Sequence, residues 1–209
     1  MTTRLLTRAP RRERPALELA PGLGLPRARL HEACGDARAT FALWLAMQTT
    51  GPVFWIAPAW NRARLNPDGM RGFVDPGRFI FVTPQRPEDV LWCMEEVLRA
   101  GAVALAVADL PAPPGLTAVR RMHLAAETGA REGGATPTGL LLTPGNGGAP
   151  GIETRWRMDG AHQREGWRLC RLRARTAPPR AWHVGGLPGP ARLTAAEAEA
   201  EAERDRRSA

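Results

Sequence analysis

Short apolar segments alternate with amphipathic segments along most of the chain. From residue 28 onward, runs rich in Val, Ile, Leu, Phe and Ala end in turn-forming residues, and most precede a stretch whose apolar residues recur every three or four positions. The runs predict strands near 29–33, 52–58, 78–84, 102–110 and 138–144. The stretches between them predict helices near 37–49, 86–101 and 116–128. This alternation predicts an α/β fold, a three-layer sandwich with a mainly parallel central sheet.

The same pattern indicates which segments are buried. Segments 52–58 and 78–84 are apolar at both alternate positions, which predicts strands covered by helices on both faces. Segment 102–110 is the most apolar and is expected near the middle of the sheet. Gly101 and Gly129 follow helical stretches and are expected to end two of the helices.

The last third of the chain has strand patterns without helices between them. The segments "ETRWRM", "GWRLCRLRART" and "RAWHV" are strand-like and are separated by polar loops. We therefore expect antiparallel strands added to one edge of the sheet. The apolar residues change phase within "WRLCRLRAR", which predicts a β-bulge near Leu169 and Cys170.

Three regions are predicted along the chain. Residues 1–27 contain many arginines and prolines without a hydrophobic period, so we expect a flexible basic arm. Residues 28–186 form the single predicted domain. Residues 187–209 end in a stretch rich in alanine, glutamate and arginine, for which we expect a solvated tail or a helix that depends on a partner.

Charge adds information about partners. Lysine and arginine together number 29, and every one of these residues is arginine. The net charge of +8 suggests a polyanionic partner, because guanidinium groups hold phosphates by paired hydrogen bonds as well as by charge. A GC-rich genome would also enrich arginine, so only part of this charge points to a partner.

Several kinds of chemistry are disfavoured. The cysteines, Cys34, Cys93 and Cys170, are far apart and odd in number, which indicates neither a disulfide framework nor a zinc site. The histidines lack metal-ligand spacing, and the only serine is Ser208, outside the predicted domain. No apolar run is long enough to cross a membrane, and the arginine-rich start lacks the apolar core of a secretory signal. We expect a cytoplasmic protein that uses no metal, no cofactor and no membrane.

Residues 29–48 have the layout of a phosphate loop. A strand-like segment runs into Gly35, and Thr40 lies near the start of a helical segment. A working loop needs a second glycine and a lysine before the Ser or Thr, because backbone N–H groups and an ammonium group surround the phosphates. Here the intervening residues include Asp36 and Arg38, and the chain has no lysine. The loop is therefore predicted to be degenerate.

The residues of this loop also have simpler interpretations. Asp109 occupies the place of a magnesium-binding acid, but an acid also commonly ends a buried strand where solvent begins. The Thr40 hydroxyl could bind magnesium, although Asp36 and Thr40 both suit the N-terminus of a helix, and we favour this capping role. Arg38 is bulkier than lysine, and the glycine that admits phosphates is missing. An anion site at this helix N-terminus is the remaining alternative.

Arginine and tryptophan gather in the last third of the chain. On adjacent antiparallel strands, alternate arginines would line one face, and tryptophans could stack on bases or on guanidinium groups. The alternative is a solvated basic face with its tryptophans in the core. The candidate residues for binding nucleic acid or a partner are Arg155, Trp156, Arg157, Arg168, Arg171, Arg173 and Arg175, with Arg164, Trp167, Arg180 and Trp182 beside them.

Four segments in the same order resemble the ImuA proteins of bacterial damage-inducible mutagenesis. They are "RLHEACGDARATFAL", "GRFIFVTPQRPEDVLWCMEEVLRAGAVALAVADL", "LTAVRRMHLAAETGA" and "TRWRM" with "GWRLCRLRAR", and they cover roughly residues 28–184. ImuA proteins are distant RecA-like domains related in fold to the cell-division inhibitor SulA. The resemblance implies a RecA-like core and a role in the SOS response. It also implies partners: an ImuB-type polymerase relative, an error-prone DNA polymerase, and RecA or its filament.

Three functional hypotheses follow. The first is a noncatalytic RecA-like adaptor that supports SOS-induced translesion synthesis through protein contacts and through single-stranded DNA. The second is a SulA-like inhibitor that binds FtsZ and blocks cell division. The third is a residual ATPase, which would bind ATP saturably and bind it less well after the substitution Asp109→Ala.

Overall fold

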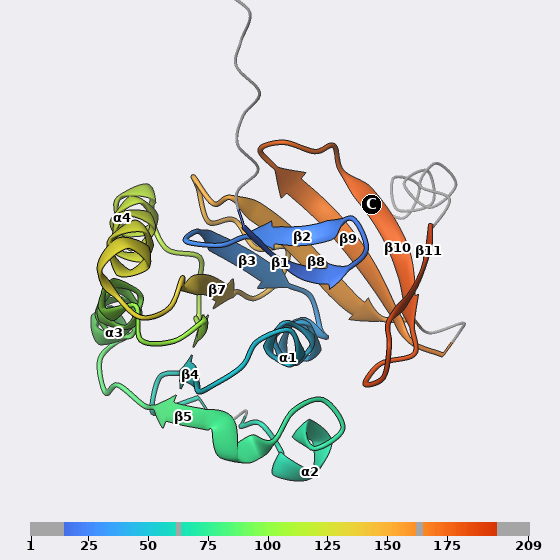
Figure 1. Ribbon diagram of the computed structural model, residues 1–209, viewed down its shortest axis with the longest axis horizontal. Helices are drawn as coiled ribbons and strands as arrows, with labels where there is room; N and C mark the ends of the chain where they lie inside the picture. Colours follow the sequence, from blue (N-terminus) through green and yellow to red (C-terminus); the bar gives the residue numbers. More distant parts are fainter. Residues whose placement is uncertain (1–14, 62–63, 162–164, 196–209) are drawn as a thin grey trace, which may run out of the picture.

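The computed structural model describes residues 15–61, 64–161 and 165–195. Within these ranges the chain forms a nine-stranded sheet and a separate two-stranded hairpin (Figure 1). The strands of the large sheet lie in the order β11-β10-β9-β8-β3-β7-β6-β4-β5. The predicted α/β fold, with a mainly parallel sheet and antiparallel strands at one edge, is confirmed.

Parallel strands form one end of the sheet and antiparallel strands the other. The parallel strands are β5 (Phe79–Val82), β4 (Val53–Ile56), β6 (Leu105–Asp109), β7 (Thr138–Leu142), β3 (Leu30–Cys34) and β8 (Thr154–Gly160). The antiparallel strands are β9 (Trp167–Ala174), β10 (Arg180–Gly185) and β11 (Arg192–Ala195). β6 is buried along its whole length inside the parallel part, in agreement with its apolar sequence.

Helices and a hairpin cover the two faces of the parallel strands. α3 (Pro87–Ala100) and α4 (Leu116–Glu132) pack on one face, where Val90, Met94 and Val119 are buried. The other face is covered by α1 (Arg38–Met47) and by the hairpin of β1 (Ala16–Ala20) and β2 (Leu23–Pro26) (Figure 1). A short helix, α2 (Pro67–Met70), and the turn η1 (Pro76–Arg78) precede β5.

Two glycines allow α3 and α4 to pack closely. Gly101 follows α3 in the left-handed conformation with a φ of 57°, as expected of a residue that ends a helix. α4 continues past Gly129, so the prediction that Gly129 ends this helix is wrong. A Cβ on Gly129 would lie 2.0 Å from the carbonyl oxygen of Leu98. Glycine is needed there because the two helices approach each other, not because a helix ends.

The C-terminal strands differ from expectation in two details. β8 pairs with β3 in parallel, whereas the sequence predicted an antiparallel strand. The chain reaches β8 from β7 through residues 143–153 without a helix, so the missing helical pattern was a poor guide to strand direction. The predicted bulge is present, but its extra residue is Leu172 and not Leu169 or Cys170.

Part of the predicted N-terminal arm is folded. Residues 1–14 lie outside the described residues, but β1 and β2 form an antiparallel hairpin within the region expected to be flexible. The buried side chains of this hairpin are Leu17, Leu19, Leu23 and Leu25, and they belong to the same core cluster as α1. Alternate leucines on two short strands bury one face, a signal that was missed among the arginines and prolines of this region.

The predicted tail begins later than expected. β11 pairs with β10, and its Leu193 lies opposite the buried Val184, so residues 192–195 belong to the sheet. The expectation of a solvated tail or partner-dependent helix concerned residues 187–209, and the part from 196 to 209 lies outside the described residues.

The outermost parallel strand is less covered than predicted. Helices were expected on both faces of segment 78–84, yet the side chain of Ile80 is 44% exposed and that of Phe81 is 53% exposed. β5 lies at the edge of the sheet and pairs with β4 (Figure 1). Hydrophobic periodicity does not distinguish an edge strand from a central strand when all of its side chains are apolar.

Candidate functional site

The degenerate phosphate loop lies between β3 and α1, at the carboxyl end of β3. Gly35 has a φ of +88°, in the left-handed region that favours glycine. A Cβ on Gly35 would lie 2.5 Å from both Asp159 Oδ1 and the carbonyl oxygen of Met158. The glycine is therefore required by the close approach of β8 to the loop.

The backbone N–H groups before α1 are used within the chain. Asp36 donates its N–H to Asp159 Oδ1 at 3.0 Å, and Ala37 donates its N–H to the Met158 carbonyl oxygen at 2.9 Å. In a working phosphate loop, N–H groups at this place point at the phosphates. Here the Asp159 carboxylate takes the position of an anionic ligand, so β8 closes the loop.

The expected capping roles are not observed. Ala37 is the N-cap residue of α1, and no side chain within the described ranges caps this helix. Asp36 is exposed, and Thr40 is half-buried in the first turn. The prediction that Asp36 or Thr40 caps α1 is wrong, because β8 already binds the N–H groups that lead into the helix.

A second set of contacts joins Arg38 to Asp109 at the end of β6. Arg38 Nε lies 3.7 Å from Asp109 Oδ1, and Asn61 donates from Nδ2 to Asp109 Oδ2 at 2.9 Å. Burial raises the pKa of Asp109, while the Arg38 charge and the Asn61 hydrogen bond act in the opposite direction. The structure thus brings Gly35, Arg38 and Asp109 together, as the phosphate-loop layout predicts, but the arginine meets an acid of its own chain.

The chemistry available for a metal at this place is limited. Within residues 15–61, 64–161 and 165–195, no group of three or more His, Cys, Asp or Glu side chains is arranged to hold a metal ion. Asp109, at the end of β6, is buried and lies beside Arg38.

Sequence reasoning missed Glu32, a fully buried carboxylate on β3. It accepts hydrogen bonds from Thr143 Oγ1 at 2.8 Å, from the Gly148 N–H at 2.8 Å and from the Ala149 N–H at 3.1 Å. These bonds hold the glycine-rich loop 144–151 against β3. The sequence signal that could have revealed this network is the single acid within the strand segment 29–33. A carboxylate buried in a strand needs several hydrogen-bond donors around it.

Arg155 belongs to this buried network and not to an open binding surface. Its Nε lies 2.5 Å from Glu32 Oε2, and its Nη2 donates to the Ala149 carbonyl oxygen at 2.9 Å. The Arg155 side chain is only 18% exposed. Its prediction as a nucleic-acid or partner contact is therefore wrong, because its guanidinium is needed to pair a carboxylate that no solvent reaches.

The other predicted arginines are divided between the two faces of the sheet. Arg173 pairs with Arg155 across β8 and β9, and Arg168 pairs with Asp159. Because residues opposite each other share a face and neighbours alternate, Arg157, Arg168 and Arg173 point to the face away from α1. Arg171 lies opposite Trp156 on the α1 face, since the bulge at Leu172 comes after it. The prediction of one arginine-lined face is wrong for Arg171.

Trp156 and Trp182 are unavailable for base stacking. Trp156 is 1% exposed, and its ring stacks on Phe41 of α1 with a centroid distance of 5.9 Å. Trp182 is also buried beside Trp156. The Arg171 guanidinium lies 5.8 Å from the Trp156 ring centroid and 5.3 Å from that of Trp182. The prediction of Trp156 as a contact residue is wrong, and the arrangement of core tryptophans beneath arginines fits the alternative.

The face away from α1 carries arginine side chains without a helix over them. The main contacts of α3 and α4 with the sheet are with β3, β4, β6 and β7, and Figure 1 shows both helices away from β9, β10 and β11. Arg173 and Arg192 are exposed, and Arg168 is half-buried. Arg157 is 42% exposed although it binds Asp159 and Asn146. We call Arg157, Arg168, Arg173 and Arg192 the basic face.

Arg175 lies outside the basic face. It follows the last residue of β9, and its Nε lies 3.5 Å from Glu153 Oε2. The side chain is 56% exposed, so the ion pair is open to water and leaves the guanidinium accessible.

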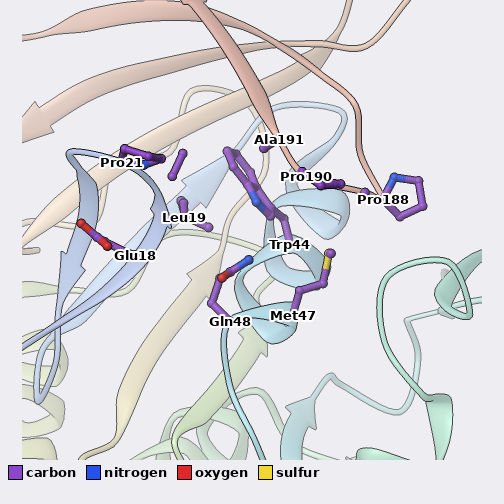
Figure 2. Close-up of a pocket in the computed structure, with 11 residues that line it drawn as sticks. Glu18, Leu19, Pro21, Trp44, Met47, Gln48, Pro188, Pro190 and Ala191 are labelled. Atoms are coloured by element: carbon purple, nitrogen blue, oxygen red, sulfur yellow. The ribbon is translucent and has the colours of Figure 1, made fainter.

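A groove of about 570 Å³ lies on the opposite side of the sheet, and no sequence motif indicated it. Figure 2 shows Trp44 and Met47 of α1 between Leu19 of β1 and the prolines that precede β11. Its lining is mostly apolar, with Glu18 as its one acidic side chain.

Among the described helices, none has the length and apolar character that crossing a lipid bilayer requires.

The sequence of this chain matches no protein family, and it matches no curated protein. Among solved structures, it is similar to the RadB recombinase with a TM-score of 0.57 and 16% identity, over 81% of this chain and 93% of that one. It is also similar to SulA from Pseudomonas aeruginosa, with a TM-score of 0.45 and 18% identity, over 57% of this chain and 100% of that one. The likeness to RadB shows that the chain has a RecA-like fold.

Proposed function

We propose that the chain is a noncatalytic RecA-like accessory protein of SOS-induced translesion synthesis and mutagenesis. Its partners would be an ImuB-type polymerase relative, an error-prone DNA polymerase, and RecA or its filament. Its basic face would contact single-stranded DNA. The RecA-like fold is compatible with this role, and the resemblance of the sequence to ImuA proteins indicates these partners.

The closed phosphate loop is the observation that carries the proposal. The N–H groups of Asp36 and Ala37 are bound to Asp159 and Met158 of β8, and the Arg38 charge lies beside Asp109. A triphosphate would have to displace these contacts and would meet no lysine. A RecA-like domain closed in this way would act through its surfaces.

The basic face supports a contact with a polyanion. Guanidinium groups on a bare sheet surface can bind phosphates in pairs of hydrogen bonds. Because Trp156 and Trp182 are buried, the contact would rely on phosphates and not on stacked bases. We therefore expect binding that is nearly independent of base sequence and strongly dependent on salt.

The decisive experiment measures partners and nucleotide with the full chain. We expect the purified protein to retain a purified ImuB-type polymerase relative or RecA in a pull-down. We expect no saturable ATP binding in equilibrium dialysis with magnesium and millimolar nucleotide. ATP binding that Asp109→Ala weakens would contradict the proposal and favour a residual ATPase. Arrest of FtsZ polymerisation by the pure protein, without retention of RecA or the polymerase relative, would favour a SulA-like inhibitor.

A further inference from the structure

β5 leaves one side of its backbone open at the edge of the sheet. Among the described strands it pairs with β4 alone (Figure 1). Ala57 donates its N–H to the Val82 carbonyl, and Ala59 donates to the Pro84 carbonyl, so these two carbonyl groups point toward β4. Backbone polar groups of successive strand residues point to opposite sides, so those of Phe79, Phe81 and Thr83 point away from β4.

The open polar groups form a short ladder. The Phe79 N–H already donates to the Pro76 carbonyl in the preceding turn. The groups that remain are the carbonyls of Phe79, Phe81 and Thr83 and the N–H groups of Phe81 and Thr83. Natural edge strands are usually protected by a charge, a proline or a covering element. β5 reads FIFV, with Ile80 44% exposed and Phe81 53% exposed.

The opposite edge of the sheet has a different surface. β11 reads RLTA, and its exposed side chains include Arg192 and Thr194. Its Leu193 packs against the core beside α1. A charged and polar edge discourages pairing with another strand, so the open apolar edge is a particular property of β5.

We propose that β5 is the interface of a homodimer in which two copies pair their β5 strands antiparallel about a twofold axis at Phe81. In this register the N–H and carbonyl of Phe81 bind the carbonyl and N–H of the same residue in the second copy. The Thr83 N–H binds the Phe79 carbonyl of the second copy, and the reciprocal bond forms by symmetry. Every open group of the ladder except the Thr83 carbonyl then has a partner, so the strand is largely complementary to itself.

One other antiparallel register satisfies this ladder less well. If the pairing moves two residues toward the start of β5, the Phe81 carbonyl meets a Phe79 N–H that Pro76 already occupies. The twofold register also closes the interface, because both copies use the same surface and no free β5 edge remains. The homodimer is independent of the proposed role in translesion synthesis.

Side chains and charges support the same pairing. The two Phe81 rings would meet on one face, where each already stacks on Phe79 with a centroid distance of 6.1 Å. Ile80 of each copy would face Val82 of the other on the opposite face. Asp75 before the strand and Arg86 after it are exposed, so antiparallel order brings the acid of one copy near the arginine of the other.

The first test is the mass of the full chain in sedimentation velocity at micromolar concentrations. We expect a concentration-dependent species of twice 22.7 kDa. Thr83→Pro removes an outward N–H without touching the β4 side, and it should weaken association about tenfold or more. Phe81→Lys should weaken association further. Trp92→Lys is the matched control, because Trp92 is 58% exposed and belongs to α3 and not to β5, and it should leave association unchanged.

Circular dichroism and the midpoint of urea unfolding identify variants that fail to fold, and Thr83→Pro and Phe81→Lys provide independent tests of the edge. A parent chain that stays at 22.7 kDa throughout this concentration range would overturn the proposal. Association of folded Thr83→Pro and Phe81→Lys as tight as that of the parent would overturn it equally.

A second test measures the register through cysteine cross-linking. In a background with Cys93→Ala and Cys170→Ala, Phe81→Cys should form a disulfide-linked dimer on oxidation, since paired Cα atoms on the axis lie about 5.5 Å apart. Thr83→Cys should not cross-link, because the two copies of that residue lie about 14 Å apart in this register. Cross-linking of Thr83→Cys with none for Phe81→Cys would overturn the register.

Discussion

The phosphate loop and the basic face differ in how their positive groups are satisfied. At the loop, Arg38 lies beside Asp109, and the Asp36 N–H binds the Asp159 carboxylate. On the basic face, Arg173 and Arg192 are exposed and form no ion pair with any residue in the described ranges. The difference teaches that a net charge of +8 does not locate a binding surface. A binding surface is located by determining which arginines are paired with acids of the same chain and which are not.

The largest effect on stability is expected from removing the buried carboxylate of Glu32. Glu32→Ala leaves Arg155 and the Thr143 hydroxyl without their buried carboxylate, so it should lower the free energy of unfolding by about 3–5 kcal/mol. Urea denaturation at neutral pH measures this loss. The matched control is Glu18→Ala at an exposed position, which should change stability by less than about 0.5 kcal/mol. Equal effects of the two substitutions would contradict the role of Glu32.

The pH dependence of stability should come mainly from the buried His31 side chain. Burial lowers the pKa of His31 from 6.5 to about 4. Its Nδ1 lies 2.7 Å from Thr154 Oγ1 and its Nε2 lies 2.9 Å from the Pro26 carbonyl. Thr154 Oγ1 also accepts a hydrogen bond from Trp156 Nε1, so its own hydrogen is directed to Nδ1 and the proton of the neutral ring lies on Nε2.

Because the unfolded chain binds this proton more readily, the stability that His31 contributes is complete above about pH 6.5 and is lost as the pH falls toward 4. The loss should be about 3 kcal/mol across that window. Burial also lowers the pKa of His123, which adds a loss of the same sign. Urea midpoints at a series of pH values measure the effect. A flat profile between pH 6.5 and 4 would contradict the neutral buried ring.

A smaller effect on stability is expected at Asp159 of β8, which binds the degenerate phosphate loop. Asp159→Ala frees the Asp36 N–H and the Arg157 guanidinium, and it should lower the free energy of unfolding by about 1–2 kcal/mol. It should not create saturable pyrophosphate binding, because the Ala37 N–H stays bound to Met158 and lysine is still absent. Isothermal titration calorimetry measures this. Tight pyrophosphate binding by Asp159→Ala would show that one carboxylate alone closes the site.

The smallest effect on stability is expected on the basic face. Arg173→Ala with Arg192→Ala, both at exposed positions, should change the free energy of unfolding by less than about 0.5 kcal/mol. The same pair should weaken single-stranded DNA binding and reduce its salt dependence by about two phosphate contacts. Arg64→Ala with Arg71→Ala removes the same charge elsewhere and is the control. Fluorescence anisotropy over a salt series measures both, and equal affinities of the two pairs would exclude this face.

The order of β4, β5, β6, β7, α3 and α4 along the chain was predictable because these strands are apolar and these two helices are amphipathic. The closed loop was predictable only in part. The sequence indicates that no lysine can bind a phosphate, but Asp159 lies more than a hundred residues from Asp36, and the contact between them depends on β8 pairing beside β3. The faces of Arg171 and Arg173 could not be predicted either, because a single extra residue, Leu172, reverses the alternation between them.

The sequence by itself determined the fold class, the loss of a working phosphate loop and the concentration of arginine in the last third. These follow from local periods and from residue types that no partner can replace. Only the tertiary structure decided which arginines are neutralised, which tryptophans are buried and which strand stands open at the edge. Pairing between distant segments sets those properties, since burial and ion pairing depend on neighbours that adjacent residues do not specify.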